Sequence, residues 1–341
     1  MLCTCQPGFE SLLERELAGS GAVPAERGPG WVHVPGPAGP PAGFDPAFAH
    51  LTLLSPVEIR GASVNALALK ILDAFAAALQ GERIEKPWTC LWQAAGEAPG
   101  LSRRAAGVEA EFGDRLKKKL SRIAKLAHPT RRVVVGPERG LFVFLVDFDR
   151  AFVARDACFN GPRRMADDPL APSRSYLKVE EAYGLLGRSP QAGETVVDLG
   201  AAPGGWSYSA AQHGARVLAI DHGALRGGAL GHPRIEHRAE DAFTYDPAAD
   251  GPIDWLFCDL IEEPHHVLRQ IVHPWLSRGW CRRFVVNLKF GRVDPLGLLG
   301  ELRAENSPFR LDANEVRIRH LFHDREEYTV VGTTRAVVPS S

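Results

Sequence analysis

The stretch VVDLGAAPGGWS, residues 196–207, decides the fold of this chain. A short apolar run ends at Asp198, a glycine-rich turn follows, and a helix can begin near Ser207. This strand–turn–helix pattern opens a doubly wound α/β domain, in which ligands bind at the carboxyl ends of parallel strands. Glycines allow the backbone to approach a ligand that a Cβ atom would block. We therefore expect a parallel α/β sheet with a ligand site at this turn.

The spacing within the turn indicates what kind of ligand binds. Gly200 is followed by Ala-Ala-Pro before Gly204 and Gly205, which departs from the G-x-G-x-x-G spacing of dinucleotide sites. No Lys-Ser/Thr pair follows, so the turn is not a phosphate-binding P-loop. The acid before the turn favours a cationic or zwitterionic ligand. S-adenosylmethionine (SAM) fits, because it combines a sulfonium, an amino acid and an adenosine.

Composition limits the remaining possibilities. The chain has 341 residues, enough for two domains or more, and a formal net charge of −1, so any nucleic-acid surface must be local. Of the six cysteines only Cys3 and Cys5 are close together, and no metal site is predicted. The first residues do not resemble a signal peptide, and no apolar run is long enough to span a bilayer. We expect a cytoplasmic protein with reduced thiols and no membrane partner.

The sequence before residue 160 predicts a small α+β module. Apolar periodicity predicts helices over 8–18, 64–79 and 115–126, and strands over 31–34, 57–60, 132–135 and 141–148. Residues 136–140 would form the turn between the last two strands, and residues 99–113 are expected to be partly loop. The segment 160–174 is rich in Pro, Arg and Asp without periodicity, and we place the domain boundary there.

Basic residues cluster on and after the predicted helix 115–126, opposite its apolar face. They are Arg115, Lys117, Lys118, Lys119, Arg122 and Lys125, followed by Arg131 and Arg132. Charge patterning alone leaves two interpretations open. The cluster is either a solvated helix face or a surface that contacts RNA phosphates.

The second half of the chain alternates predicted strands and helices. Strands are expected to end near residues 199, 221, 238, 258 and 288, with an antiparallel closing pair over 311–321 and 327–333. A helix over 177–186, capped by Ser173 or Ser175, would lead into the first of these strands. Charged residues at the strand ends would converge on one crevice. These residues are Asp198, Asp221, Asp241, Asp259 and Lys289.

The charges suggest how SAM would bind. Asp221 can accept hydrogen bonds from both ribose hydroxyls, Asp241 can accept one from the adenine amino group, and Asp259 would lie near the sulfonium. The floor under the methionine part would be formed by Gly200, Ala202, Pro203, Gly204 and Gly205, with Trp206 next in the chain. A lysine between a carboxylate and a cationic cofactor can have a lowered pKa, so Lys289 would suit a general base.

These residues resemble a known family. The stretches 173–181, 196–207 and 323–327, together with Asp259 and Asn287-Leu288-Lys289, are similar to the family of ribosomal RNA large subunit methyltransferase M. That family comprises SAM-dependent RNA 2′-O-ribose methyltransferases with a Rossmann-like class I domain and a Lys-Asp-Lys-Glu tetrad. The resemblance implies that the tetrad is Lys178, Asp259, Lys289 and Glu326. Glu326 is chosen over Glu327 because the family motif matches Asp324-Arg325-Glu326.

The resemblance also implies partners and domains. SAM contacts would come from Ser175, the turn 202–205, Asp221 and Asp241, and Lys289 would accept the proton. The target would be a cytidine ribose in the peptidyl-transferase region of 23S rRNA, as free or precursor RNA. Residues 1–56 would form a ferredoxin-like segment and 57–160 a THUMP RNA-binding domain. A linker over 161–172 would join them to a methyltransferase domain over 173–341.

Other functions remain open at this point. The methyl acceptor could be the ribose of a tRNA or of another rRNA site. A base N-methyltransferase would show Asn/Asp-Pro-Pro-Tyr/Phe where this chain has Cys258-Asp259-Leu260-Ile261. A cytosine C5 enzyme needs a cysteine nucleophile, whereas Cys258 reads as a buried strand residue. A non-catalytic ribosome-assembly factor that keeps SAM as a structural ligand is a further alternative.

Overall fold

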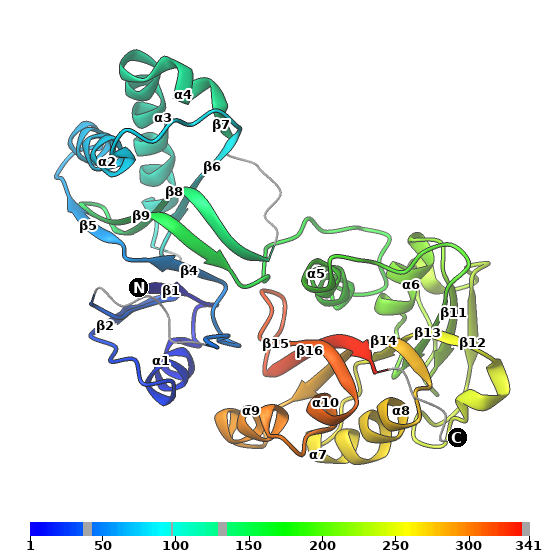
Figure 1. Ribbon diagram of the computed structural model, residues 1–341. Coiled ribbons are helices and arrows are strands. Elements are labelled where there is room, and N and C mark those ends of the chain that lie inside the picture. Colours follow the sequence, from blue (N-terminus) through cyan, green and yellow to red (C-terminus); the bar gives the residue numbers. More distant parts are fainter. Residues whose placement is uncertain (37–42, 97, 129–134, 336–341) are drawn as a thin grey trace. The chain divides into compact units, whose positions relative to one another are not determined.

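The computed structural model describes residues 1–36, 43–96, 98–128 and 135–335. It divides into two compact units, Met1–Asn160 and Gly161–Ser341, each with its own sheet (Figure 1). Among the described residues, no helix is both long enough and apolar enough to cross a membrane.

The first unit contains a nine-stranded sheet. The strand order is β2-β3-β1-β4-β9-β8-β6-β7, and β5 pairs with β9. The strands are β1 (Leu2–Thr4), β2 (Glu26–Gly28), β3 (Trp31–His33), β4 (Leu51–Leu54), β5 (Val57–Arg60), β6 (Trp88–Ala94), β7 (Ala127–His128), β8 (Gly136–Asp147) and β9 (Arg150–Phe159). Because β4 pairs with β9, one sheet continues across the expected subdivision at residues 56 and 57.

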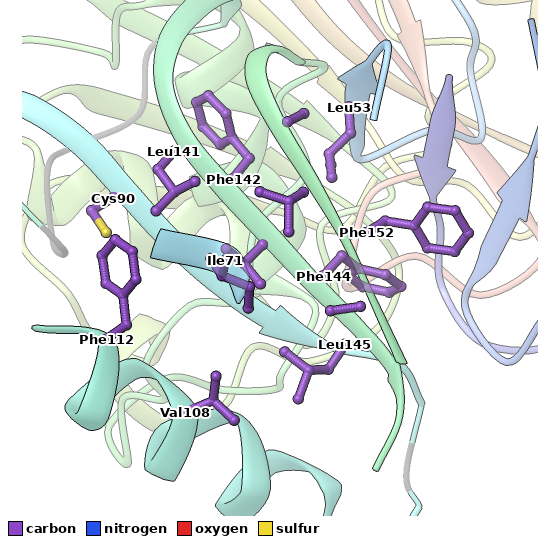
Figure 2. Packing of buried hydrophobic residues seen from close by; sticks show 14 of the residues in the cluster. Leu53, Ile71, Cys90, Val108, Phe112, Leu141, Phe142, Phe144, Leu145 and Phe152 are labelled. Atoms are coloured by element: carbon purple, nitrogen blue, oxygen red, sulfur yellow. The ribbon is translucent and has the colours of Figure 1, made fainter. Parts of the chain in front are cut away.

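Helices supply the rest of the core of this unit. They are α1 (Glu10–Gly19), α2 (Val64–Leu79), α3 (Leu101–Lys119) and α4 (Ser121–Leu126). Figure 2 shows Val108 and Phe112 of α3 in the same apolar cluster as Phe142 and Leu145 of β8. Burying such side chains is the main source of stability of a domain of this size.

The structure corrects two expectations for this unit. Residues 99–113 are loop only at positions 99 and 100, because α3 begins at Leu101 and buries Ala105, Val108 and Phe112 on one face. This apolar stripe is interleaved with charged residues that hide it in the sequence. Residues 136–140 are not a turn, since they form the first part of β8, which pairs with β9. The expected strand 132–135 lies almost wholly outside the described residues.

The second unit contains a seven-stranded sheet in the order β12-β11-β10-β13-β14-β16-β15. The strands are β10 (Thr195–Leu199), β11 (Arg216–Ile220), β12 (Ile235–Arg238), β13 (Ile253–Cys258), β14 (Cys281–Lys289), β15 (Ala313–Arg319) and β16 (Glu327–Thr334). The first five in the spatial order are parallel, and β16 is antiparallel to both neighbours. The predicted α/β fold with an antiparallel closing pair is confirmed.

The chain reverses its direction of travel across this sheet at β10. From β10 it moves outward to β11 and β12, and it then returns to β13 on the other side. Such a switch point opens a crevice at the carboxyl ends of the two central strands. The helices of this unit are α5 (Tyr176–Leu186), α6 (Gly205–Gln212), α7 (Pro264–Val267), α8 (His273–Ser277), α9 (Pro295–Arg303) and α10 (Pro308–Leu311).

Candidate active site

The turn after β10 requires glycine at three positions. Gly200 and Gly204 have positive φ angles of 79° and 104°. A Cβ atom on Gly200 would lie 2.8 Å from Leu260 Cδ2, and one on Gly205 would lie 2.8 Å from Ser175 Oγ. The turn is therefore packed closely between the residues that follow β13 and those that precede α5.

Carboxylates stand at the ends of the two neighbouring strands. Asp221, after β11, accepts hydrogen bonds from the backbone N–H groups of Ala202 at 2.9 Å and Gly223 at 2.7 Å. These bonds fix the carboxylate beside the turn and leave each oxygen a second lone pair for a ligand. Asp241, beyond β12, is exposed and accepts from the Phe243 N–H at 3.0 Å.

Asp198 and Trp206 support the turn from within the protein. The Asp198 side chain accepts a hydrogen bond from Ser207 Oγ at 2.6 Å, and burial raises its pKa to about 7. The Trp206 indole is buried and donates to the Ser175 carbonyl at 2.9 Å. The sequence predicts both residues among the cofactor contacts. Each side chain has a protein partner, and a contact of either residue with the cofactor stays a prediction.

The residues before α5 also differ from expectation. Ser175 is the N-cap residue, but its hydroxyl makes no capping hydrogen bond. Its Oγ lies 2.7 Å from Ser173 Oγ and occupies the space left by the missing Cβ of Gly205. Ser175 therefore lies directly against the glycine turn, which is the place expected for a residue that contacts the cofactor.

A compact cluster of two lysines and two carboxylates lies at the same end of the sheet. Lys178 Nζ, from α5, is 3.7 Å from Asp259 Oδ2 and forms an ion pair with Glu327 Oε1. Lys289 Nζ, from the end of β14, is 2.7 Å from Glu327 Oε2 and forms an ion pair with Asp259 Oδ1. Each lysine thus bridges both carboxylates, and the four side chains are between 5% and 23% exposed.

The structure corrects the fourth member of this cluster from Glu326 to Glu327. Glu327 is the register partner of Lys289 across β14 and β16, and directly opposed residues project from the same face of a sheet. Glu326 is the residue just before β16, and it is exposed, with its carboxylate beside Gly291. The motif match had favoured the wrong one of two adjacent glutamates because strand register is invisible in the sequence.

Mutual pairing decides the protonation of the cluster. Burial raises the pKa of Glu327, but Lys178 and Lys289 outweigh it and bring this pKa down to about 2. Burial lowers the pKa of Lys289, but Asp259 and Glu327 outweigh it, and the pKa lies above the ordinary lysine value. In the protein alone the Lys289 pKa is therefore raised, because two carboxylates stabilise its charge, and the depression expected beside a cationic cofactor stays a prediction.

Two further features bear on the alternatives. Cys258 is fully buried, and burial raises the pKa of its thiol to about 12, which is unsuited to a thiolate nucleophile. Within the described parts of the chain, no group of three or more His, Cys, Asp or Glu side chains could hold a metal ion.

The expected RNA-binding residues lie in the first unit, on α3 and α4. Lys117, Lys118 and Lys119 are exposed, as are Arg122 and Lys125. Lys117 lies 3.4 Å from Asp114 and Lys119 lies 2.9 Å from Asp73, and both pairs are exposed to solvent. Arg115 is half-buried and paired with Glu111 at 2.6 Å. Arg131 and Arg132 lie outside the described residues.

Sequence reasoning missed a set of polar residues behind the cluster. Asn287 is buried two residues before Lys289, and Thr329 is buried two residues after Glu327. Strand periodicity could have found both, because residues two apart share a face. Asp324 is also buried, in the turn before β16.

The fold and the site define a SAM-dependent methyltransferase domain. The FtsJ-like methyltransferase family matches residues 171–276, which run from before α5 into α8.

Relatives specify the family. A ribosomal RNA large subunit methyltransferase M from Actinobacillus pleuropneumoniae is 39% identical over 188 residues, and the aligned part is 50% of this chain and about half the length of that relative. Proteins of the same name from Xanthomonas oryzae and Marinomonas are 31% and 32% identical, and these alignments cover 97% of this chain and 98% of each relative. The chain belongs to the family of ribosomal RNA large subunit methyltransferase M.

Among solved structures, TrmN from Thermus thermophilus covers 98% of this chain at 17% identity, with a TM-score of 0.38.

Proposed function

We propose that this protein transfers the methyl group of SAM to the 2′-hydroxyl of a ribose in ribosomal RNA. The observation that carries this proposal is the cluster of Lys178, Asp259, Lys289 and Glu327 beside the glycine turn. The two are joined through the backbone, because the Asp259 N–H donates to the carbonyl of Leu199 at 3.3 Å.

The residues around the turn fit the cofactor. Asp221 and Asp241 would hold the adenosine, and Asp259 would lie near the sulfonium. Backbone N–H groups in the first turn of α6 suit the methionine carboxylate, since a helix N-terminus attracts anions. When bound there, SAM supplies a methyl group activated by the positive charge of its sulfur.

Lys289 is the proposed general base. Lys289 Nζ would take the proton of the 2′-hydroxyl as that oxygen accepts the methyl group, which SAM would supply by leaving as S-adenosylhomocysteine. Lys289 must first lose its own proton, and its raised pKa opposes that step. A cationic group near Asp259 would lower the Lys289 pKa again, because like charges disfavour each other. Lys178 would steer the hydroxyl, and alignment would supply much of the rate.

The substrate is proposed at the level that the family implies. We infer that the methyl acceptor is a cytidine in the peptidyl-transferase region of 23S rRNA, presented as free or precursor RNA in the cytoplasm. The first unit would act as the THUMP-like RNA-binding part, with the exposed lysines of α3 and α4 on RNA phosphates. Lys117, Lys118 and Lys119 support this because they are exposed, and the ion pairs of Lys117 and Lys119 lie in solvent, where such pairs contribute little.

Mass-spectrometric mapping of ribose methylation in 23S rRNA tests the proposal. We expect one cytidine to lose its 2′-O-methyl group when the gene is deleted. The wild-type gene and Glu326→Gln should restore it, whereas Lys289→Ala and Glu327→Gln should not. Restoration by Lys289→Ala would indicate the assembly-factor alternative. A methyl group missing from a tRNA instead would correct the substrate.

A further inference from the structure

A chain of buried polar side chains leads from the cluster into the protein. Asn287 Nδ2 lies 3.2 Å from Asp259 Oδ1, and Asn287 Oδ1 lies 2.7 Å from Thr329 Oγ1. Thr329 Oγ1 in turn lies 2.9 Å from Asp324 Oδ2 and 3.2 Å from its Oδ1. Asn287, Thr329 and Asp324 are all at most 1% exposed, so these polar groups are closed off from bulk solvent.

The orientation of the Asn287 amide follows from its neighbour. Asp259 faces the ammonium groups of Lys178 and Lys289, so its carboxylate is an acceptor and needs a donor from Asn287. The NH2 group of Asn287 therefore points to Asp259, and its carbonyl oxygen points to Thr329.

Proton counting then decides the state of Asp324. A threonine hydroxyl has one proton, and the Asn287 carbonyl can be satisfied only if Thr329 donates to it. Thr329 can then only accept from Asp324, which is possible only if Asp324 carries a proton. An ionised Asp324 would instead compete for the same hydroxyl proton. The Asn287 carbonyl would then be left as a buried acceptor without a donor, which is costly.

We propose that Asp324 is a neutral carboxylic acid in the folded protein and that Asp324, Thr329 and Asn287 form a directed hydrogen-bond relay that orients the Asp259 carboxylate toward the two lysines. This proposal deepens the proposed methyl transfer and rests on it for the role of Asp259. Asp324 is a positioning residue, because it acts on the cluster through two other side chains.

The charges around Asp324 agree with a neutral acid. Burial raises the pKa of Asp324, and Glu327 from β16 and Glu181 from α5 raise it further, while Lys178 and the Leu321 N–H work in the opposite direction. The pKa of Asp324 therefore lies well above the ordinary value of an aspartate. The Leu321 N–H donates to Oδ2 at 2.8 Å, which a protonated carboxyl can accept on its carbonyl oxygen while its hydroxyl faces Thr329.

The consequence is a carboxylate with a fixed direction. Asp259 Oδ1 receives both Asn287 and Lys289, which leaves Oδ2 toward Lys178. Loss of the relay would free the Asn287 amide to rotate and present its oxygen to Asp259, which repels it. Lys289 would then lose its alignment with the acceptor hydroxyl.

The test compares Asp324→Asn with Thr329→Val in the full-length protein. Asparagine copies the neutral acid, since its NH2 can donate to Thr329 and its oxygen can accept from Leu321. We expect Asp324→Asn to keep kcat for methyl transfer within about threefold of wild type. Thr329→Val should lower kcat about tenfold with unchanged SAM affinity, and Thr329→Ser should restore it, because one buried hydrogen bond is lost and regained.

Infrared difference spectroscopy gives a readout that does not depend on methyl transfer. At neutral pH the wild-type minus Asp324→Asn spectrum should show the C=O stretch of a protonated carboxyl. A carboxylate band in its place, or a loss of kcat in Asp324→Asn as large as in Thr329→Val, would overturn the relay. If the protonated band is present but the wild-type protein methylates no rRNA, the neutral acid stands and the proposed function fails.

Discussion

Each unit of this protein contains two cations paired with two carboxylates, and the two groups differ in their exposure to water. In the first unit Arg139 lies 2.8 Å from Asp156 and 3.0 Å from Glu82, and Arg155 lies 3.0 Å from Glu82. In the second unit the corresponding group is the cluster of Lys178, Asp259, Lys289 and Glu327.

The distances are similar, but the surroundings are not. The side chains of Arg139, Asp156 and Glu82 are 52%, 46% and 35% exposed, and only that of Arg155 is as low as 12%. All four side chains of the second group are between 5% and 23% exposed. Water and salt screen an exposed pair, so it contributes little to stability. A buried pair is held in one geometry and depends on its partners, because an uncompensated charge there is costly. Only the buried group can therefore set the protonation and direction of a reacting lysine.

Removal of one cation from each group should give the largest contrast in activity. Lys289→Ala is expected to lower methyl transfer by about 10³-fold, because proton transfer by a positioned side chain contributes on that order. SAM affinity should change little. Arg139→Ala is the control and should leave the rate unchanged. The rate is measured by transfer of a labelled methyl group to 23S rRNA, and equal losses in the two variants would refute the contrast.

Removal of a carboxylate from each group should separate their effects on stability. Glu327→Ala leaves two buried lysines short of a partner and is expected to lower the free energy of unfolding by about 3–5 kcal/mol. Asp156→Ala should cost about 0–1 kcal/mol, because its pair with Arg139 is exposed at both ends. Urea unfolding at neutral pH measures both changes. A Glu327→Ala protein as stable as Asp156→Ala would show that the cluster is not buried in solution.

The pH dependence of methyl transfer should come from the buried cluster and not from the group around Arg139. The pKa of Lys289 is raised, so the deprotonated base is a minor form at neutral pH and its fraction rises with pH. We expect the rate of methyl transfer under non-saturating SAM to rise about tenfold per pH unit around neutrality. Arg139→Ala should show the same profile. A rate that is flat with pH would mean that Lys289 does not lose its proton in the rate-limiting step.

At low pH the protein should lose the stability that the buried cluster contributes through Glu327. The folded-state pKa of Glu327 is about 2, below the value of about 4.3 for an unfolded glutamate. Its contribution to stability is therefore complete above about pH 4.3 and is lost as pH falls toward about 2. Glu327→Gln should have a flatter decline of unfolding free energy over this window than wild type, as measured by urea titrations at each pH.

The smallest effect is expected from the lysines exposed on the first unit. Joint replacement of Lys117, Lys118 and Lys119 by alanine should reduce the salt slope of rRNA binding by about two, as expected when three phosphate contacts are lost. Replacement of three exposed arginines of the second unit is the matched control: Arg216, Arg282 and Arg310. An unchanged slope in the lysine variant would remove these residues from the RNA-binding surface.

The sequence by itself determined the parallel α/β sheet, the glycine turn and the strand-end residues Asp259 and Lys289 of the cluster, while Lys178 was implied by the family resemblance. These features depend on local patterns, such as the apolar run before Asp198 and the lysine that ends β14. Period and spacing are properties of neighbouring residues, so they can be seen without the fold.

Only the tertiary structure decided between Glu326 and Glu327 and linked Asn287 to Asp324. Those outcomes depend on which residue of β16 faces Lys289 and on which polar groups are closed off from water. Register and burial arise from contacts between residues far apart in the chain, and no local pattern encodes them.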